Sequence, residues 1–141
     1  MDLHPFAVHF PVALLAVSLA FELTGIYTKR EDFSRTAWWV QIVGTAGALA
    51  AVGTGLLAQS RQTFGGEARA MLESHQQSAF AIAALFVFLL LWRISAKGRV
   101  PSSHTIPYML LFVAGVLLLL AGAWYGGELV FRFGAGARTL P

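Results

Sequence analysis

The sequence predicts an all-α integral membrane protein, a four-helix bundle of up-down-up-down topology with a short C-terminal cap on the periplasmic side. Three observations lead to this fold class. Of the 141 residues, 57% are apolar and 12% are charged, whereas an ordinary soluble domain is about 25% charged. Four segments reach the length of about 20 mostly apolar residues that a helix needs to cross a bilayer. Short polar connections separate them, as expected for neighbouring antiparallel helices of a single domain, residues 1–141.

The four spans are expected at about residues 5–27, 36–58, 75–95 and 105–125. The intervening stretches TKREDFSR, SRQTFGGEARAMLE and AKGRVPSSH are polar enough to be loops. We expect the third span to start as a wet, amphipathic turn before Ser78, since EARAMLESHQQ is too polar for lipid. Gly126 and Gly127 are expected to break the fourth span, so that ELVFRF folds back as the cap over one end of the bundle.

The distribution of basic residues predicts the orientation of the spans. The connections after the first and third spans carry six of the ten basic residues, and the opposite side carries four. Basic residues favour the cytoplasmic side. Both termini are therefore expected on the outside, which in a bacterial inner membrane is the periplasm. In that orientation His4, His9 and His75 lie on the outer side at similar depth, and His104 lies on the inner side.

The first span begins with HPFAVHFPVALL, which places two histidines and two prolines where an apolar run starts. Pro5 suits the first position of a helix. Pro11 leaves the carbonyl of Ala7 without its helical partner, which predicts a kink close to His9. His4 and His9 are five positions apart and so should point in directions about 140° apart. The two histidines are therefore not expected to bind one centre side by side.

An ionisable residue inside a membrane span is a candidate for function, and His9 is one. His75 opens the third span at the matching depth. Two neutral imidazoles from two helices can serve as the axial ligands of a b-type haem, so His9 and His75 are the predicted ligands of the haem iron, with His4 as the substitute for either. The structural alternative is that these histidines are hydrogen-bonded or hydrated residues at the membrane interface and bind no cofactor. A zinc site of His4, His9 and His75 would need a fourth ligand, such as Glu73 or Glu128.

Two further features admit a structural and a functional interpretation. Gly44, Ala48, Ala51 and Gly55 share one face of the second span, either for close helix packing or to let a flat macrocycle lie against the backbone. Glu22, inside the first span, is expected to form a salt bridge with Lys29, Arg30 or Arg93 rather than to relay protons. Arg132 could bind a haem propionate, although a solvated arginine is the simpler interpretation.

Several classes of function are disfavoured by composition. The chain has no cysteine, which excludes disulfides, thiolate-held iron–sulfur clusters and covalent haem attachment through C-x-x-C-H. The net charge of +3 is spread between apolar runs, so nucleic-acid binding has little support. Only Asp2 precedes the first apolar run, and the basic start of a cleaved signal peptide is missing. The spans hold too few polar groups for a transport pathway, and no nucleophile–base pair indicates an enzyme.

The segments HPFAVHFPVALL, ESHQQSAF and GGELVFRFGAGA together resemble a family of small bacterial membrane proteins known as domain of unknown function 2231. The resemblance covers essentially the whole chain. The resemblance implies redox partners, because members of the family are often joined to, or found beside, Rieske or cytochrome c domains. Many relatives carry a histidine in the tail where this sequence has Phe133, preceded by Arg132. A second haem is therefore not expected.

Two functions remain at this stage. The first is a membrane-anchored b-type haem protein that transfers electrons near the periplasmic face of the bacterial inner membrane, with redox proteins as partners. The second is a cofactor-free structural or accessory subunit of a larger respiratory or photosynthetic membrane complex. Either is an electron carrier or accessory protein rather than an enzyme, surrounded by membrane lipids. A quinone or a chlorophyll-type pigment in place of haem stays open, because these ligands also favour histidines and aromatic slots.

Overall fold

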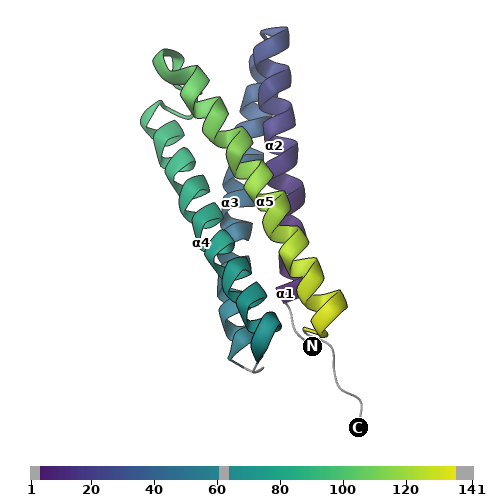
Figure 1. Cartoon of the computed structure of the whole chain (residues 1–141). Coiled ribbons are helices and arrows are strands. Elements are labelled where there is room, and N and C mark those ends of the chain that lie inside the picture. Colours follow the sequence, from purple (N-terminus) through teal and green to yellow (C-terminus); the bar gives the residue numbers. More distant parts are fainter. Residues whose placement is uncertain (1–3, 61–63, 136–141) are drawn as a thin grey trace.

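The computed structural model describes residues 4–60 and 64–135, and all regular secondary structure within these ranges is helical. The elements are α1 (His4–Ala7), α2 (His9–Thr28), α3 (Glu31–Gln59), α4 (Gly66–Ser95), the 3-10 turn η1 (Ser102–His104) and α5 (Thr105–Phe133). Helices α2 and α3 form one antiparallel hairpin and α4 and α5 form a second, and the two hairpins pack into one bundle (Figure 1). The predicted all-α, up-down-up-down fold is confirmed.

Within residues 4–60 and 64–135, four helical segments, with α1 and α2 taken together, are long and apolar enough to cross a membrane. Their outward surfaces are apolar, with Val17, Leu23, Leu117 and Leu120 among the exposed side chains. Their buried surfaces include polar side chains, among them Ser18, Glu22, Gln41, Thr45 and Arg93. Apolar groups face outward and polar groups pair inside where lipid is the solvent. This distribution therefore supports the expectation that the bundle is embedded in a bilayer.

The third and fourth spans, helices α4 and α5, are longer than predicted. Helix α4 has 30 residues and begins at Gly66 rather than as a wet turn before Ser78. At 1.5 Å per residue it is about 45 Å long, against about 30 Å for the hydrocarbon core of a bilayer. The polar first turns of α4 therefore extend beyond the apolar span as helix. Their polarity limits how deep they lie in lipid, not whether they are helical.

The expectation that Gly126 and Gly127 break the last span was wrong. Helix α5 continues through both glycines to Phe133, and it ends where Gly134 adopts the left-handed conformation with φ of 67°. ELVFRF is thus the end of α5 and not a cap that folds back. A helical glycine costs about 1 kcal/mol relative to alanine. Packing offsets this cost, because a Cβ at Gly126 would lie 3.1 Å from the His75 ring.

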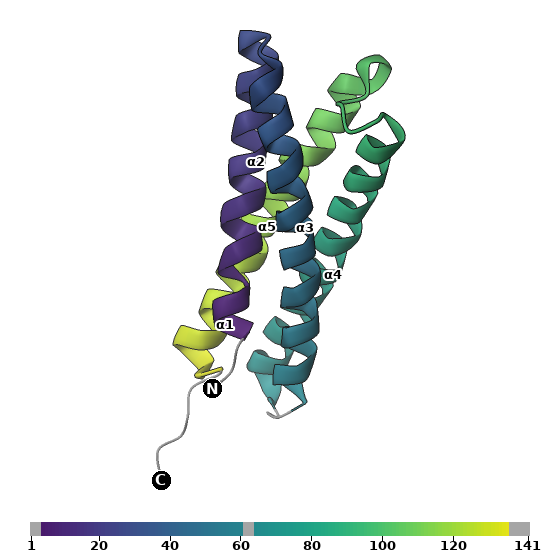
Figure 2. The same cartoon turned by 180° about the vertical axis from the view of Figure 1, so that it is seen from behind.

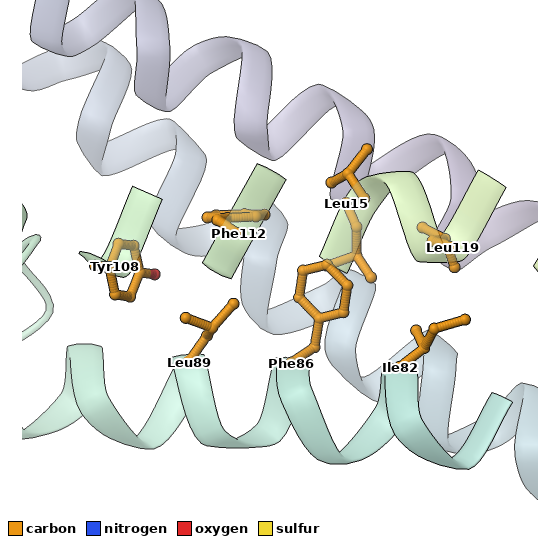
Figure 3. Packing of buried hydrophobic residues seen from close by; sticks show 8 residues of the cluster. Leu15, Ile82, Phe86, Leu89, Tyr108, Phe112 and Leu119 are labelled. Atoms are coloured by element: carbon orange, nitrogen blue, oxygen red, sulfur yellow. The ribbon is translucent and has the colours of Figure 1, made fainter. Parts of the chain in front are cut away.

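The core of the bundle is a cluster of large apolar side chains from α2, α4 and α5. Leu15 of α2 projects toward Phe86 and Ile82 of α4 and toward the side chains of α5 (Figure 3). The rings of Phe86 and Phe112 pack edge to face with centroids 5.5 Å apart, a favoured aromatic geometry. The cluster holds the two hairpins together and fixes the rotation of α4 about its axis.

The helical assignment of the first span lapses at Val8, one residue before His9, although Val8 keeps helical dihedral angles. The kink expected here stays a prediction. Val8 donates its backbone N–H to the carbonyl of His4 and accepts from Val12. Pro11 has no N–H to donate to the carbonyl of Ala7, so one helical hydrogen bond is missing there. The short helix α1 is thus the first turn of the same span and leads directly into α2 (Figure 2).

The small residues of α3 allow close helix packing, the first of the two purposes considered for them, and the contact with a macrocycle stays a prediction. A Cβ at Gly44 would lie 2.8 Å from the Leu15 side chain, and one at Gly47 would lie 3.4 Å from Pro11. This part of α3 allows close approach of α2, as small residues do between membrane helices. Further along, a Cβ at Gly55 would lie 2.9 Å from the His4 ring. At that end of α3, the missing side chain makes room for a histidine.

Candidate cofactor site

Three histidines gather at one end of the bundle, here called the histidine end. It is defined by His4, His9 and His75, and it also holds the end of α5 and the start of α4 (Figure 1). The imidazole rings of His4 and His75 lie with their centroids 6.1 Å apart and their planes at 74°. Helix α1 packs on α2 and α3, while α4 packs on α3 and α5. The two rings thus approach one another from helices on opposite sides of the bundle.

The Nδ1 atoms of both rings are held by the remaining two helices. Nδ1 of His75 lies 3.0 Å from the backbone carbonyl of Gly122 on α5, and Nδ1 of His4 lies 3.2 Å from the hydroxyl of Thr54 on α3. A carbonyl oxygen only accepts hydrogen bonds, so the hydrogen in the first contact belongs to His75 Nδ1. In the neutral ring, the lone pair of His75 then lies on Nε2, the nitrogen from which imidazole can bind a metal.

Each ring also lies against a glycine. A Cβ at Gly55 would lie 2.9 Å from Cε1 of His4, and a Cβ at Gly126 would lie 3.1 Å from Cε1 of His75. A real Cβ essentially never shows the first separation and rarely the second. The two glycines therefore fix how close each ring lies to its neighbouring helix.

The two rings line a cavity of about 680 Å³. Its walls are mainly apolar, with small residues of α3 and α5, including Ala48, Ala51 and Ala123, beside larger ones such as Ile82 and Leu119. Binding pockets for small molecules and cofactors measure about 300–1,000 Å³ and combine apolar walls with a few placed polar groups. The cavity has these properties, and the imidazoles are among its few polar groups.

His9 lies at the edge of the same cavity, but it is exposed. Its Nδ1 lies 2.6 Å from the carbonyl of Pro5, one turn back in its own span. The structure therefore brings His4, the residue predicted as the substitute, into ring contact with His75. The pairing of His9 with His75 stays a prediction. His4 and His9 do point in different directions, one into the bundle and one to its surface.

The carboxylates and the arginine considered for this end lie outside the His4–His75 contact. Arg132 forms a salt bridge of 2.9 Å with Glu67, and both side chains are exposed. Glu73 pairs with Arg69 at 3.0 Å. Within the described residues no group of three or more His, Asp or Glu side chains could hold a metal ion. The three-histidine zinc site gains no support from this arrangement, and the role of Arg132 at a propionate stays a prediction.

At the opposite end of the bundle, the expected salt bridge of Glu22 is confirmed, and its partner is Arg93. The Arg93 Nη1 atom lies 2.6 Å from Oε2 of Glu22, and both side chains are buried. The Ser34 hydroxyl also donates to Glu22. His104 lies at this end, where Nδ1 contacts the Ser103 hydroxyl at 2.8 Å. Glu22, Arg93 and Ser34 are thus paired with one another, as a structural role requires.

Sequence reasoning overlooked Thr54 and Gly122. Both lie in small-residue stretches, where threonine and glycine are expected for helix packing alone. The sequence does offer a signal for Thr54, because this polar residue directly precedes Gly55, the last position of the small-residue face. No sequence signal identifies a backbone carbonyl such as that of Gly122. Its role depends on which helix packs beside His75.

Residues 1–139 match the family described as Predicted membrane protein (DUF2231). No curated protein and no solved structure matches the chain.

Proposed function

We propose that this chain, which belongs to the DUF2231 family of predicted membrane proteins, is a membrane cytochrome that binds one b-type haem between His4 and His75 and transfers electrons. The observation that carries this proposal is the approach of two imidazoles from opposite helices within an apolar cavity. A haem of this type needs two such ligands and an apolar slot around them.

The separation of the rings fits two ligands on one iron. A bond between a metal and an imidazole nitrogen is about 2 Å long. A five-membered ring with sides of about 1.33 Å has its centre about 1.1 Å from each ring atom. Two bonds and two such radii together span about 6 Å, and the observed distance between the centroids is 6.1 Å. A bare metal ion would fit this distance too, but it would not need a cavity of about 680 Å³.

The hydrogen bond to His75 supports the same role. Histidines that bind metals usually donate their other ring N–H to a carbonyl, a carboxylate or water, which fixes the ring and raises its basicity. The Gly122 carbonyl does this for His75. When bound, the haem supplies reversible one-electron oxidation and reduction of its iron. The chain supplies two oriented ligands and apolar walls that limit access of water.

The remaining parts of the proposal concern place and partners. The bias of basic residues toward the end opposite the histidines supports a bacterial inner membrane, with both termini and the haem near the periplasmic face. The proposed partners are redox proteins at that face or within a larger membrane complex. The haem then lies within reach of a partner that docks at the histidine end.

The optical spectrum of the purified protein tests this function. The full-length chain is expressed with ample haem, and spectra are recorded before and after addition of dithionite. We expect a Soret band and, after reduction, the α and β bands of a six-coordinate b-type haem. His4→Ala and His75→Ala should abolish this spectrum, while His9→Ala and His104→Ala should keep it.

Two outcomes would overturn the proposal. A colourless wild-type protein would reject haem, and its stable co-purification with a membrane complex would favour the cofactor-free accessory subunit. A spectrum lost in His9→Ala but kept in His4→Ala would reject His4 and return the ligand pair to His9 and His75.

A further inference from the structure

We infer that Thr54 is a positioning residue for His4. Its hydroxyl oxygen accepts a hydrogen bond from Nδ1–H of His4 and thereby places the lone pair of the ring on Nε2. This inference rests on the proposed function, because the lone pair on Nε2 is the ligand that the haem iron would use.

The hydrogen count at Thr54 supports this direction of the bond. The Thr54 Oγ1 atom lies 3.0 Å from the carbonyl of Ala51 and 3.2 Å from Nδ1 of His4. A hydroxyl has one hydrogen to donate, and a carbonyl oxygen can only accept. If the hydroxyl hydrogen serves the Ala51 carbonyl, the hydrogen between Thr54 and His4 must belong to the imidazole. Thr54 then acts as the acceptor, as the Gly122 carbonyl does for His75.

The two histidines have equivalent surroundings, although they come from different helices. His4 has the hydroxyl of Thr54 and the adjacent Gly55, both from α3. His75 has the carbonyl of Gly122 and, one turn later, Gly126, both from α5. Each ring is therefore held by one acceptor at Nδ1 and by close contact with a glycine at Cε1. The repetition of this arrangement favours a shared purpose over chance packing of a threonine.

The consequence of losing the acceptor follows from the chemistry of imidazole. An acceptor at Nδ1–H makes the ring a stronger electron donor and holds its orientation. Without it, the ring can carry its hydrogen on Nε2, which blocks the ligating atom. The weaker donor also stabilises ferric iron less, so the midpoint potential should rise. Loss of such outer-shell partners typically weakens metal binding by about 10- to 100-fold.

Two variants of Thr54 separate this role from packing. Thr54→Val keeps the shape of the side chain and removes the acceptor, and Thr54→Ser keeps the hydroxyl. Thr24→Val is the matched control, because the Thr24 hydroxyl donates to the carbonyl of Ala20 in its own helix, and that hydrogen bond is exposed. We expect Thr54→Val to bind haem at least about 10-fold more weakly than wild type, with a higher midpoint potential. Thr54→Ser and Thr24→Val should match the wild type in both measurements.

A second measurement needs no haem. The 15N chemical shifts of the histidine side chains in the haem-free, full-length protein report which ring nitrogen carries the hydrogen. We expect the Nδ1–H form of His4 in wild type and in Thr54→Ser, and a loss of that preference in Thr54→Val. An Nε2–H form of His4 in wild type would overturn the inference, as would Thr54→Val with unchanged affinity and potential. A colourless wild-type protein with His4 in the Nδ1–H form would instead reject only the proposed haem.

Discussion

The guanidinium of Arg93 lies 2.6 Å from the carboxylate of Glu22, and the two side chains are 1% and 0% exposed. The same guanidinium donates to the carbonyl of Ser34 at 2.8 Å and to the carbonyl of Gly98 at 3.0 Å. Arg93 of α4 therefore joins α2, the start of α3 and the connection to α5. At the end of the bundle opposite the histidines, one buried cation holds the two hairpins together.

Removal of Arg93 should strongly destabilise the bundle. Breaking a buried ion pair costs about 3–5 kcal/mol, because the remaining charge stays buried without compensation. We expect Arg93→Met to lower the free energy of unfolding by this amount, measured by denaturation in detergent micelles. Arg69→Ala is the control, since it breaks an exposed i,i+4 pair with Glu73 that is worth about 0.3–0.5 kcal/mol.

A double variant tests whether the cost comes from the unpaired charge. Glu22→Leu combined with Arg93→Met removes both charges, and apolar replacement of a buried pair is often neutral. We expect the double variant to regain most of the stability that Arg93→Met loses. A double variant no more stable than the single one would show that the hydrogen bonds of Arg93 to Ser34 and Gly98, rather than its charge, hold the hairpins.

Loss of the Tyr108 hydroxyl should have a small effect on stability. The hydroxyl donates to Oε1 of Gln41 at 3.1 Å, and both side chains are buried. Hydrogen bonds between membrane helices average about 0.6 kcal/mol. We expect Tyr108→Phe to reduce the free energy of unfolding by about this amount and to leave the optical spectrum unchanged. A loss comparable to that of Arg93→Met would mean that Tyr108 is essential to the whole buried network.

A methyl group at Gly55 should disturb His4. The new Cβ would lie 2.9 Å from the ring, so the ring must move. We expect Gly55→Ala to lower the haem content of the purified protein, measured as the ratio of Soret absorbance to protein. Gly53→Ala is the control on the same helix, because a Cβ there meets nothing within 4 Å. It should keep the wild-type haem content and gain up to about 1 kcal/mol of helix stability. Equal haem content in the two variants would contradict the contact between Gly55 and His4.

A parallel pair of variants tests the site of His75. A Cβ at Gly126 would lie 3.1 Å from the His75 ring, whereas one at Gly127 meets nothing within 4 Å. We expect Gly126→Ala to alter the ligand spectrum or reduce haem content, and Gly127→Ala to do neither. The contact at Gly126 is looser than that at Gly55, so its effect should be the smaller of the two. A larger effect of Gly127→Ala would contradict the orientation of α5 in which Gly126, and not Gly127, faces the His75 ring.

The sequence was a good guide to the spans and a poorer guide to their ends. Runs such as VALLAVSLAF and AFAIAALFVFLL mark what enters lipid, because each unsatisfied polar group in hydrocarbon is costly. Helices continue past the apolar run wherever the backbone can keep its hydrogen bonds, as α4 does from Gly66 and α5 does through Gly127. Polarity and glycine content alone therefore placed those boundaries too close to the apolar cores.

The candidate site was likewise predictable from the sequence only in part. The sequence by itself determined that His4, His9 and His75 share one end of the bundle, since apolar spans of similar length set the depth of every residue along them. It also determined that Pro11 disturbs the helix near His9, because proline has no N–H to donate. Only the tertiary structure decided that the ring opposite His75 is that of His4, because the rotation of each helix about its axis depends on how α1 packs on α3 and α4 on α5.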